Sequence, residues 1–281
     1  MKASSLPYGL IARGVQARGL EAVTEWVGFC VERGLDGVEI AEHWLHSLDW
    51  LEVHALLEQL RRSNLAVSAF NAFNSRTNCA IGEPRNAAVR EMRRYLDMAD
   101  RFGARIMIIG SGEWADYERY RMSRSEAVDN TVATIERCLP LAERKGIVLA
   151  IENHPGWLTR YADVLAQILE RLPSAHLGLN LDTGSLYREG QRPDEVLRYD
   201  VVARKAVYVH LKSIRFEPEP DLGRWDQSVS FEESQVDYAG IFATLKAVDF
   251  DGWVSYESSA EVGLEGIARG VSWLRSAWPT W

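Results

Sequence analysis

Ile147-Val-Leu-Ala-Ile151 is a run of five apolar residues, and Glu152-Asn-His154 follows it without a break. Such a run predicts a strand that is buried on both faces, which is typical of parallel sheets covered by helices. Glu152 would then stand where the strand ends. A carboxylate in that position is costly unless a partner neutralises it. The stretch therefore predicts a parallel α/β fold and raises the question of what Glu152 binds.

Similar short apolar runs recur along the chain, and amphipathic stretches with helical spacing lie between them. The apolar runs predict strands over residues 37–41, 65–70, 105–109, 147–151, 177–181, 206–209 and 253–256. A helix is predicted over residues 19–34 before the first of these strands. Further helices are predicted over residues 50–64, 86–102, 123–145, 159–172, 193–199, 238–248 and 264–277. The segment 4–10 would supply an eighth strand at the start.

Eight strand–helix units in 281 residues predict a (β/α)8 TIM barrel, as a single domain over residues 1–281. A doubly wound sheet is the alternative. That fold would need a glycine-rich phosphate loop after a strand, and the sequence contains neither GxGxxG nor a GxxxxGK motif. Two long connections, residues 71–84 and 214–236, would lie on the face of the barrel where loops usually carry function.

The composition restricts the partners of this protein. A net charge of -8 and a pI near 5.4 exclude a general affinity for nucleic acid or for an anionic membrane. Cys30, Cys79 and Cys138 are widely spaced and form no CxxC pair, so we expect neither a disulfide framework nor a thiolate metal site. The sequence shows no apolar leader and no run long enough to span a bilayer, and a cytoplasmic protein is expected.

A carboxylate or an imidazole ends each of the last four predicted strands: Glu152, Asp182, His210 and Glu257. The carboxyl ends of barrel strands converge on one mouth, where barrel enzymes place their chemistry. Three carboxylates packed together repel one another, and a divalent cation removes that repulsion. This donor set suits Mn2+ or Mg2+, with Co2+, Fe2+ and Zn2+ as alternatives, and leaves about two positions of an octahedral ion for water or substrate.

Each of these residues also has a structural interpretation. A single acidic residue at a strand end is more often the N-cap of the next helix than a metal ligand, and Asp182 before Thr-Gly-Ser fits that role. Four such residues at consecutive strand ends favour the metal site over coincidence.

Motifs along nearly the whole chain resemble the xylose isomerase-like barrel superfamily. They are Glu-Asn-His at 152–154, Leu-Asp-Thr-Gly at 181–184, Val-His-Leu-Lys at 209–212, Gly-Trp-Val-Ser-Tyr-Glu at 252–257 and, on the second strand, Gly-Leu-Asp-Gly-Val-Glu-Ile at 34–40. The resemblance implies a mononuclear site, often with Mn2+ or Mg2+, made of Glu152, Asp182, His210 and Glu257. In the ketose 3-epimerase branch of this superfamily, the two ligand glutamates also move the proton.

Two positions depart from the epimerase pattern and leave the branch open. Ser185 stands where these epimerases usually carry a histidine, and Phe216 stands where they carry an arginine, with Arg215 one place earlier. The superfamily also contains dehydroshikimate and inosose dehydratases. Endonuclease IV fits poorly, because its trinuclear zinc site resembles a histidine-rich cluster, and the third, fourth and sixth strands here end without a histidine.

Further side chains are expected around the mouth. Lys212 lies two residues past His210 and points the same way, as an acid or an enolate partner, or in an ion pair with a carboxylate. His154, two residues past Glu152, would bind a hydroxyl or protonate a leaving group, or else fix the turn before Pro155. A structural place in the barrel interior is expected for Glu39. Substrate contacts are expected from His43, Asn71, Trp114, Trp157, Ser185 and Arg215.

The function expected from these features is that of an isomerase or epimerase acting on a sugar or a related polyhydroxy carbonyl compound. Catalysis would run through a metal-stabilised enediolate, with Glu152 and Glu257 exchanging the proton. A lyase or dehydratase that expels a hydroxyl or glycosyl group is the alternative, with His154 or Lys212 as the proton donor. A non-catalytic metabolite-binding or partner subunit is a further alternative. The oligomeric state stays open, with a homo-oligomer as one option.

Overall fold

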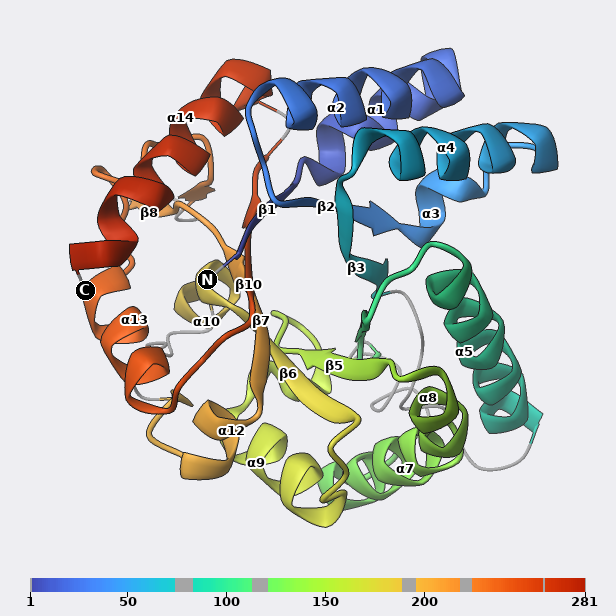
Figure 1. Cartoon of the computed structure of the whole chain (residues 1–281). Helices are drawn as coiled ribbons and strands as arrows, with labels where there is room; N and C mark the ends of the chain where they lie inside the picture. The colour runs from blue at the N-terminus through green and yellow to red at the C-terminus, as the bar shows by residue number, and fades with distance from the viewer. Residues whose placement is uncertain are drawn as a thin grey trace.

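Eight parallel strands form a ring, and the helices surround it (Figure 1). The computed structural model describes residues 2–73, 83–112, 121–188, 196–217, 224–259 and 261–280. Around the ring, the strand order is β1-β10-β7-β6-β5-β4-β3-β2. The strands are β1 (Lys2–Leu6), β2 (Gly37–Ala41), β3 (Ala66–Ala72), β4 (Ile106–Ile109), β5 (Val148–Glu152), β6 (Leu177–Asp182), β7 (Ala206–Leu211) and β10 (Trp253–Glu257). The architecture is therefore the TIM barrel that the alternation of strands and helices predicts.

The first and second strands stand at the two ends of this sheet and nearly close it. The backbone N–H of Asp36, just before β2, donates to the carbonyl of Ala3 in β1 over 3.0 Å. The Asp36 carboxylate accepts the N–H of Ala3 over 2.7 Å. These two bonds satisfy polar groups that an open sheet edge would leave unpaired.

The helices follow the predicted alternation, except that those over residues 8–18, 42–45 and 183–188 were not predicted. They are α1 (Tyr8–Arg18), α2 (Leu20–Glu32), α3 (Glu42–Leu45), α4 (Trp50–Ser63), α5 (Glu83–Arg101), α7 (Arg124–Glu136), α8 (Leu139–Lys145), α9 (Ala162–Arg171), α10 (Thr183–Arg188), α12 (Asp200–Arg204), α13 (Tyr238–Ala247) and α14 (Gly263–Ala277). Capping boxes start α4, with Asp49 and Glu52, and α7, with Ser123 and Glu126. A short hairpin of β8 (Arg215–Glu217) and β9 (Arg224–Asp226) follows β7.

Most predicted bounds differ from the structure by three residues or fewer, and three predicted elements differ more. The first strand ends at Leu6 instead of residue 10, because Pro7 precedes a helix that the sequence analysis did not predict, α1. The helix predicted over 123–145 is two helices, since Pro140 has no N–H to donate to the preceding turn and lies at the start of α8. Of the helix predicted over 193–199, residues 193–195 lie outside the described residues, and α12 begins at Asp200.

The side chains inside the ring are mostly apolar in one part of the barrel and polar near the carboxyl ends of the strands. An apolar cluster of Ala69, Ile106, Ile108, Ala150 and Tyr208 fills the part away from the strand ends. Polar side chains occupy the part near the carboxyl ends, where the buried residues include Glu39, Asn71, Asn180 and His210. The charged and amide side chains of the interior therefore lie near the mouth of the barrel. No helix in the described part of the chain is both long and apolar enough to cross a lipid bilayer.

Candidate metal centre

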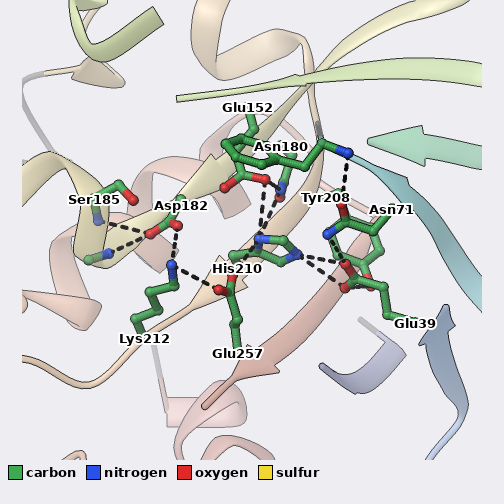
Figure 2. Close-up of polar contacts among 12 residues, drawn as sticks. Glu39, Asn71, Glu152, Asn180, Asp182, Ser185, Tyr208, His210, Lys212 and Glu257 are labelled. Carbon is green, nitrogen blue, oxygen red and sulfur yellow. Dashed lines mark hydrogen bonds and ion pairs between the residues drawn. The ribbon is translucent and has the colours of Figure 1, made fainter. Parts of the chain in front are cut away.

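Four side chains from consecutive strand ends meet at the mouth of the barrel (Figure 2). Glu152, Asp182 and Glu257 are the last residues of β5, β6 and β10, and His210 is the next to last residue of β7. Each offers a ligand atom, and these atoms all lie within 4.8 Å of one another. Glu152, Asp182 and His210 are buried, and Glu257 is mostly buried. The structure thus brings together the four residues that the sequence analysis selected.

The separations within the cluster are those of ligands around one ion. His210 Nδ1 lies 2.8 Å from Glu257 Oε2 and 3.5 Å from Glu152 Oε2. Neighbouring ligands of an octahedral ion with bonds of about 2.1 Å stand roughly 3 Å apart. Three carboxylates and one imidazole also form the donor set that a hard or borderline divalent cation takes. The residues present therefore fit such an ion in both spacing and chemistry.

Lys212 brings a positive charge against two of these carboxylates. Its Nζ lies 2.7 Å from Asp182 Oδ2 and 3.0 Å from Glu257 Oε1. The sequence analysis kept two roles for Lys212, and the ion-pair role is the one seen in these contacts.

Asp182 combines the two roles that the sequence analysis weighed against each other. Its Oδ1 accepts the backbone N–H groups of Gly184 and Ser185 over 3.0 and 2.9 Å, which caps the start of α10. Its Oδ2 faces Lys212 and the cluster. One carboxylate oxygen therefore serves the helix while the other remains available to a cation.

Asn153 fastens the ends of β5 and β6 to each other. Its amide nitrogen donates to the carbonyl of Asp182 over 2.9 Å, and its amide oxygen accepts the N–H of the same residue over 2.9 Å. Asn153 is fully buried. Because both bonds reach one residue, they fix the spacing between the carboxylates of Glu152 and Asp182.

The imidazole of His210 is held from its far side by Glu39 of β2. Nε2 lies 3.1 Å from both carboxylate oxygens of Glu39. The same carboxylate accepts the amide of Asn71 over 2.8 Å and the hydroxyl of Tyr208 over 2.9 Å. Glu39 is fully buried, in the barrel interior where the sequence analysis placed it. Its contact with His210 was not predicted, and neither was that of Asn180, whose Nδ2 lies 2.9 Å from Glu152 Oε2 and 3.1 Å from His210 Nδ1.

The two glutamates of the cluster have opposite protonation tendencies. Burial raises the pKa of Glu152 to about 7, although attraction to His210 opposes the rise. Burial also acts to raise the pKa of Glu257, but attraction to Lys212 and His210 outweighs it and lowers that pKa below its ordinary value. Burial would lower the pKa of His210, yet the surrounding carboxylates, Glu39 first among them, raise it well above its ordinary value. The environment thus shifts the pKa values of two chemically identical carboxyl groups in opposite directions.

An aromatic wall stands beside the cluster, made of Phe73, His154 and Trp157. Ring centroids lie 4.3 Å apart for Phe73 and Trp157, and 4.7 Å apart for Phe73 and His154. His154 Nδ1 lies 2.8 Å from the carbonyl of Pro155, so that nitrogen carries the proton and donates it. Burial and the charge of Lys212 lower the pKa of His154 to about 4. His154 is therefore a neutral imidazole whose Nε2 is the acceptor.

The other predicted substrate contacts lie in several places. The amide of Asn71 donates to Glu39 and accepts the N–H of Phe73 over 3.0 Å, so both its ends are engaged in the protein. Ser185 is buried behind Asp182. Arg215 starts the β8–β9 hairpin and lies 3.7 Å from the Glu233 carboxylate. His43 lies in α3, and Trp114 lies outside the described residues.

Comparisons with known proteins agree with this architecture. The family model described as xylose isomerase-like TIM barrel matches residues 27–277. The inosose dehydratase of Clostridium botulinum is 22% identical over 81% of this chain and 79% of its own length. A solved D-tagatose 3-epimerase-like protein superposes with a TM-score of 0.76 at 19% identity, over 100% of this chain and 98% of its own. The IOLI protein, solved with a bound zinc atom, gives 0.78 at 16% identity, over 99% of both chains.

Proposed function

The chain belongs to the xylose isomerase-like TIM barrel family, and we propose that it is a divalent-metal-dependent isomerase or epimerase. Its substrate would be a sugar or a related polyhydroxy carbonyl compound of small size. The names of its relatives support this class, because they include a D-tagatose 3-epimerase-like protein and an inosose dehydratase. Both names refer to carbonyl chemistry on a polyhydroxylated carbon skeleton.

The observation that carries the proposal is the placement of Glu152 and Glu257 on two sides of one centre. Their strands, β5 and β10, are separated in the ring by β6 and β7. Their carboxylates nevertheless come within 3.5 and 2.8 Å of the same atom, His210 Nδ1. Inversion beside a carbonyl requires one group that removes a proton and a second that returns it to the other face. Two carboxylates across a shared centre meet that requirement.

Glu152, Asp182, His210 and Glu257 would hold the ion, with Mn2+ as the first to test and Mg2+, Co2+, Fe2+ and Zn2+ as alternatives. A bound divalent ion supplies Lewis acidity, which lowers the pKa of the C–H bond beside the substrate carbonyl. Burial raises the pKa of Glu152 to about 7 in the metal-free protein, so this carboxylate is the more basic of the two glutamates and would be the one to take the proton. Glu257 stays ionised, because attraction to Lys212 and His210 outweighs its burial. The aromatic wall of Phe73, His154 and Trp157 would exclude water from one side of the substrate.

A lyase or dehydratase is the second candidate, and the position of Lys212 favours it. That reaction would begin with the same proton removal and would then need an acid for the departing hydroxyl. Lys212 Nζ, beside Asp182 and Glu257, would be the donor, because it carries protons at neutral pH: burial would lower its pKa, but attraction to these carboxylates raises it above the ordinary value. His154 has its proton engaged with the carbonyl of Pro155 and a pKa of about 4.

The experiment that tests the proposal compares EDTA-treated protein with protein reloaded with Mn2+, on a panel of ketoses, keto-inositols and 3-keto-glycosides. Turnover that depends on the ion and fails in Glu152→Gln supports it, and the product distinguishes an epimer from a dehydrated compound. Glu136→Gln, an exposed change on α7, is the matched control and should keep full turnover. Turnover that survives metal removal would contradict it. A protein that binds metabolites without turning them over would be the non-catalytic alternative.

A further inference from the structure

We propose that Glu39 is a positioning residue that fixes which nitrogen of His210 faces the metal. The inference rests on the proposed metal site and deepens it. His210 has two ring nitrogens, and only a nitrogen without a proton is able to bind an ion. What decides the tautomer is the group that contacts the opposite nitrogen.

The contact geometry at Glu39 allows only one neutral tautomer of His210. An ionised carboxylate accepts hydrogen bonds and donates none. Both oxygens of Glu39 lie 3.1 Å from His210 Nε2, so Nε2 must carry the proton. Nδ1 faces the other carboxylates, 2.8 Å from Glu257 and 3.5 Å from Glu152, so a proton on Nδ1 is also accepted in the metal-free protein. An ion held between Glu152 and Glu257 would replace the proton on Nδ1, whereas Nε2 would keep its proton on Glu39, and the lone pair would then be on Nδ1. Figure 2 shows Glu39 on one side of the His210 ring and Glu152 and Glu257 on the other. Glu39 would thus direct the lone pair of His210 toward the proposed ion.

The carboxylate of Glu39 is itself held in place by a line of donors across the barrel. Asn71 donates to Oε1 over 2.8 Å, and Tyr208 donates to Oε2 over 2.9 Å. The Tyr208 hydroxyl lies 2.8 Å from the hydroxyl of Ser68, which lies 2.7 Å from that of Ser4. Each hydroxyl in this line is able to donate to the next one and finally to Glu39. The line compensates a fully buried carboxylate that would otherwise be costly.

Glutamine at position 39 would weaken the preference of His210 for a proton on Nε2 while preserving the shape of the side chain. Its amide NH2 group would stand against His210 Nε2 in place of one acceptor oxygen. Nε2–H would keep one acceptor, the amide oxygen, but a donor would stand beside it, so a proton on Nδ1, where it blocks the metal, would become more favourable. Tyr208→Phe removes a donor to the same carboxylate but leaves both acceptor oxygens in place, so His210 keeps its tautomer. The two substitutions therefore separate a positioning role from general packing of the barrel interior.

Titration of the metal-free wild type, Glu39→Gln and Tyr208→Phe with Co2+ tests this, read from the visible absorption of the bound ion. We expect Glu39→Gln to weaken Co2+ binding by about 10- to 100-fold and Tyr208→Phe by less than about threefold. Equal weakening by the two variants would overturn the inference, because both would then act through packing. Tight binding by Glu39→Gln would overturn it as well.

Nitrogen NMR of the Zn2+-loaded wild type with labelled histidine gives an answer that needs no variant, should Glu39→Gln fail to fold. We expect His210 to show a protonated Nε2 and a metal-bound Nδ1. The reverse pattern would overturn the inference. If the wild type binds neither Co2+ nor Zn2+, the proposed metal site is wrong, and the inference about Glu39 is wrong with it. A wild type that binds both ions, but with a protonated Nδ1 or an unaffected Glu39→Gln, would remove only the role of Glu39.

Discussion

Replacing Glu152 by Gln is expected to stabilise the metal-free protein at neutral pH while it removes the proposed function. Glu152 is buried, and burial raises its pKa from 4.5 to about 7. The folded protein therefore prefers the protonated carboxyl, and its ionised form at pH 8 costs about 3 kcal/mol, since each pH unit is worth about 1.4 kcal/mol. Glutamine keeps an oxygen that is able to accept the amide of Asn180, so the local packing is retained.

The pH dependence follows from the sign of this pKa change. A raised pKa in the folded state contributes stability that is fully present below pH 4.5 and is lost as the pH rises through about 7. Glu152→Gln carries no such loss. The variant and the wild type should therefore have similar free energies of unfolding near pH 4.5, and the variant should be more stable by about 3 kcal/mol at pH 8.

Urea unfolding with EDTA, at several pH values between 5 and 8, measures this difference directly. Glu136→Gln, the exposed control, should differ from the wild type by less than about 0.5 kcal/mol at every pH. A Glu152→Gln variant that is less stable than the wild type by a constant amount would refute the reasoning. In that case, Glu152 would be a structural residue whose charge the fold accommodates without cost.

Three further outcomes are expected. Because Glu152 and the ligand imidazole must lose protons to bind an ion, metal affinity measured by calorimetry should rise at least tenfold per pH unit between about pH 5 and 7, and a flat profile would contradict this. Asn153→Leu leaves buried backbone groups of β6 unpaired and should lower the free energy of unfolding by about 2–4 kcal/mol; a loss below about 1 kcal/mol would show that the two bonds matter little. Gly110→Ala places a methyl group against the ring of Trp157 and should cost about 1–3 kcal/mol and shift the tryptophan emission, whereas Gly28→Ala, which meets open space, should not destabilise; equal effects would contradict the close packing.

The barrel and its four converging residues could be predicted from the sequence for one physical reason. In a closed parallel barrel, the carboxyl end of every strand reaches the same mouth. A residue such as Asp182 is therefore placed as soon as the end of its strand is known. The strand bounds were predicted well enough for this because the apolar runs stop where the acidic residues begin, as in Val148–Glu152.

What could not be predicted depends on distances across the ring. Glu39 and His210 are 171 residues apart, and their strands are not neighbours in the sheet. The alternation of side chains shows that both point inward, but it does not show which inward residues meet. Local breaks were also missed, as with α1 after Pro7, because a helix start next to a strand end depends on the path of the chain around the barrel.

The most direct test of the central claim is proton NMR of the Mn2+-loaded protein with the substrate panel in D2O, read after the ion has been removed. If Glu152 and Glu257 move a proton beside a carbonyl, deuterium should replace the hydrogen at that carbon in the wild type. The exchange should disappear in Glu152→Gln and persist in Glu136→Gln. Exchange that continues unchanged in Glu152→Gln, or that is absent across the whole panel with metal bound, would contradict the account.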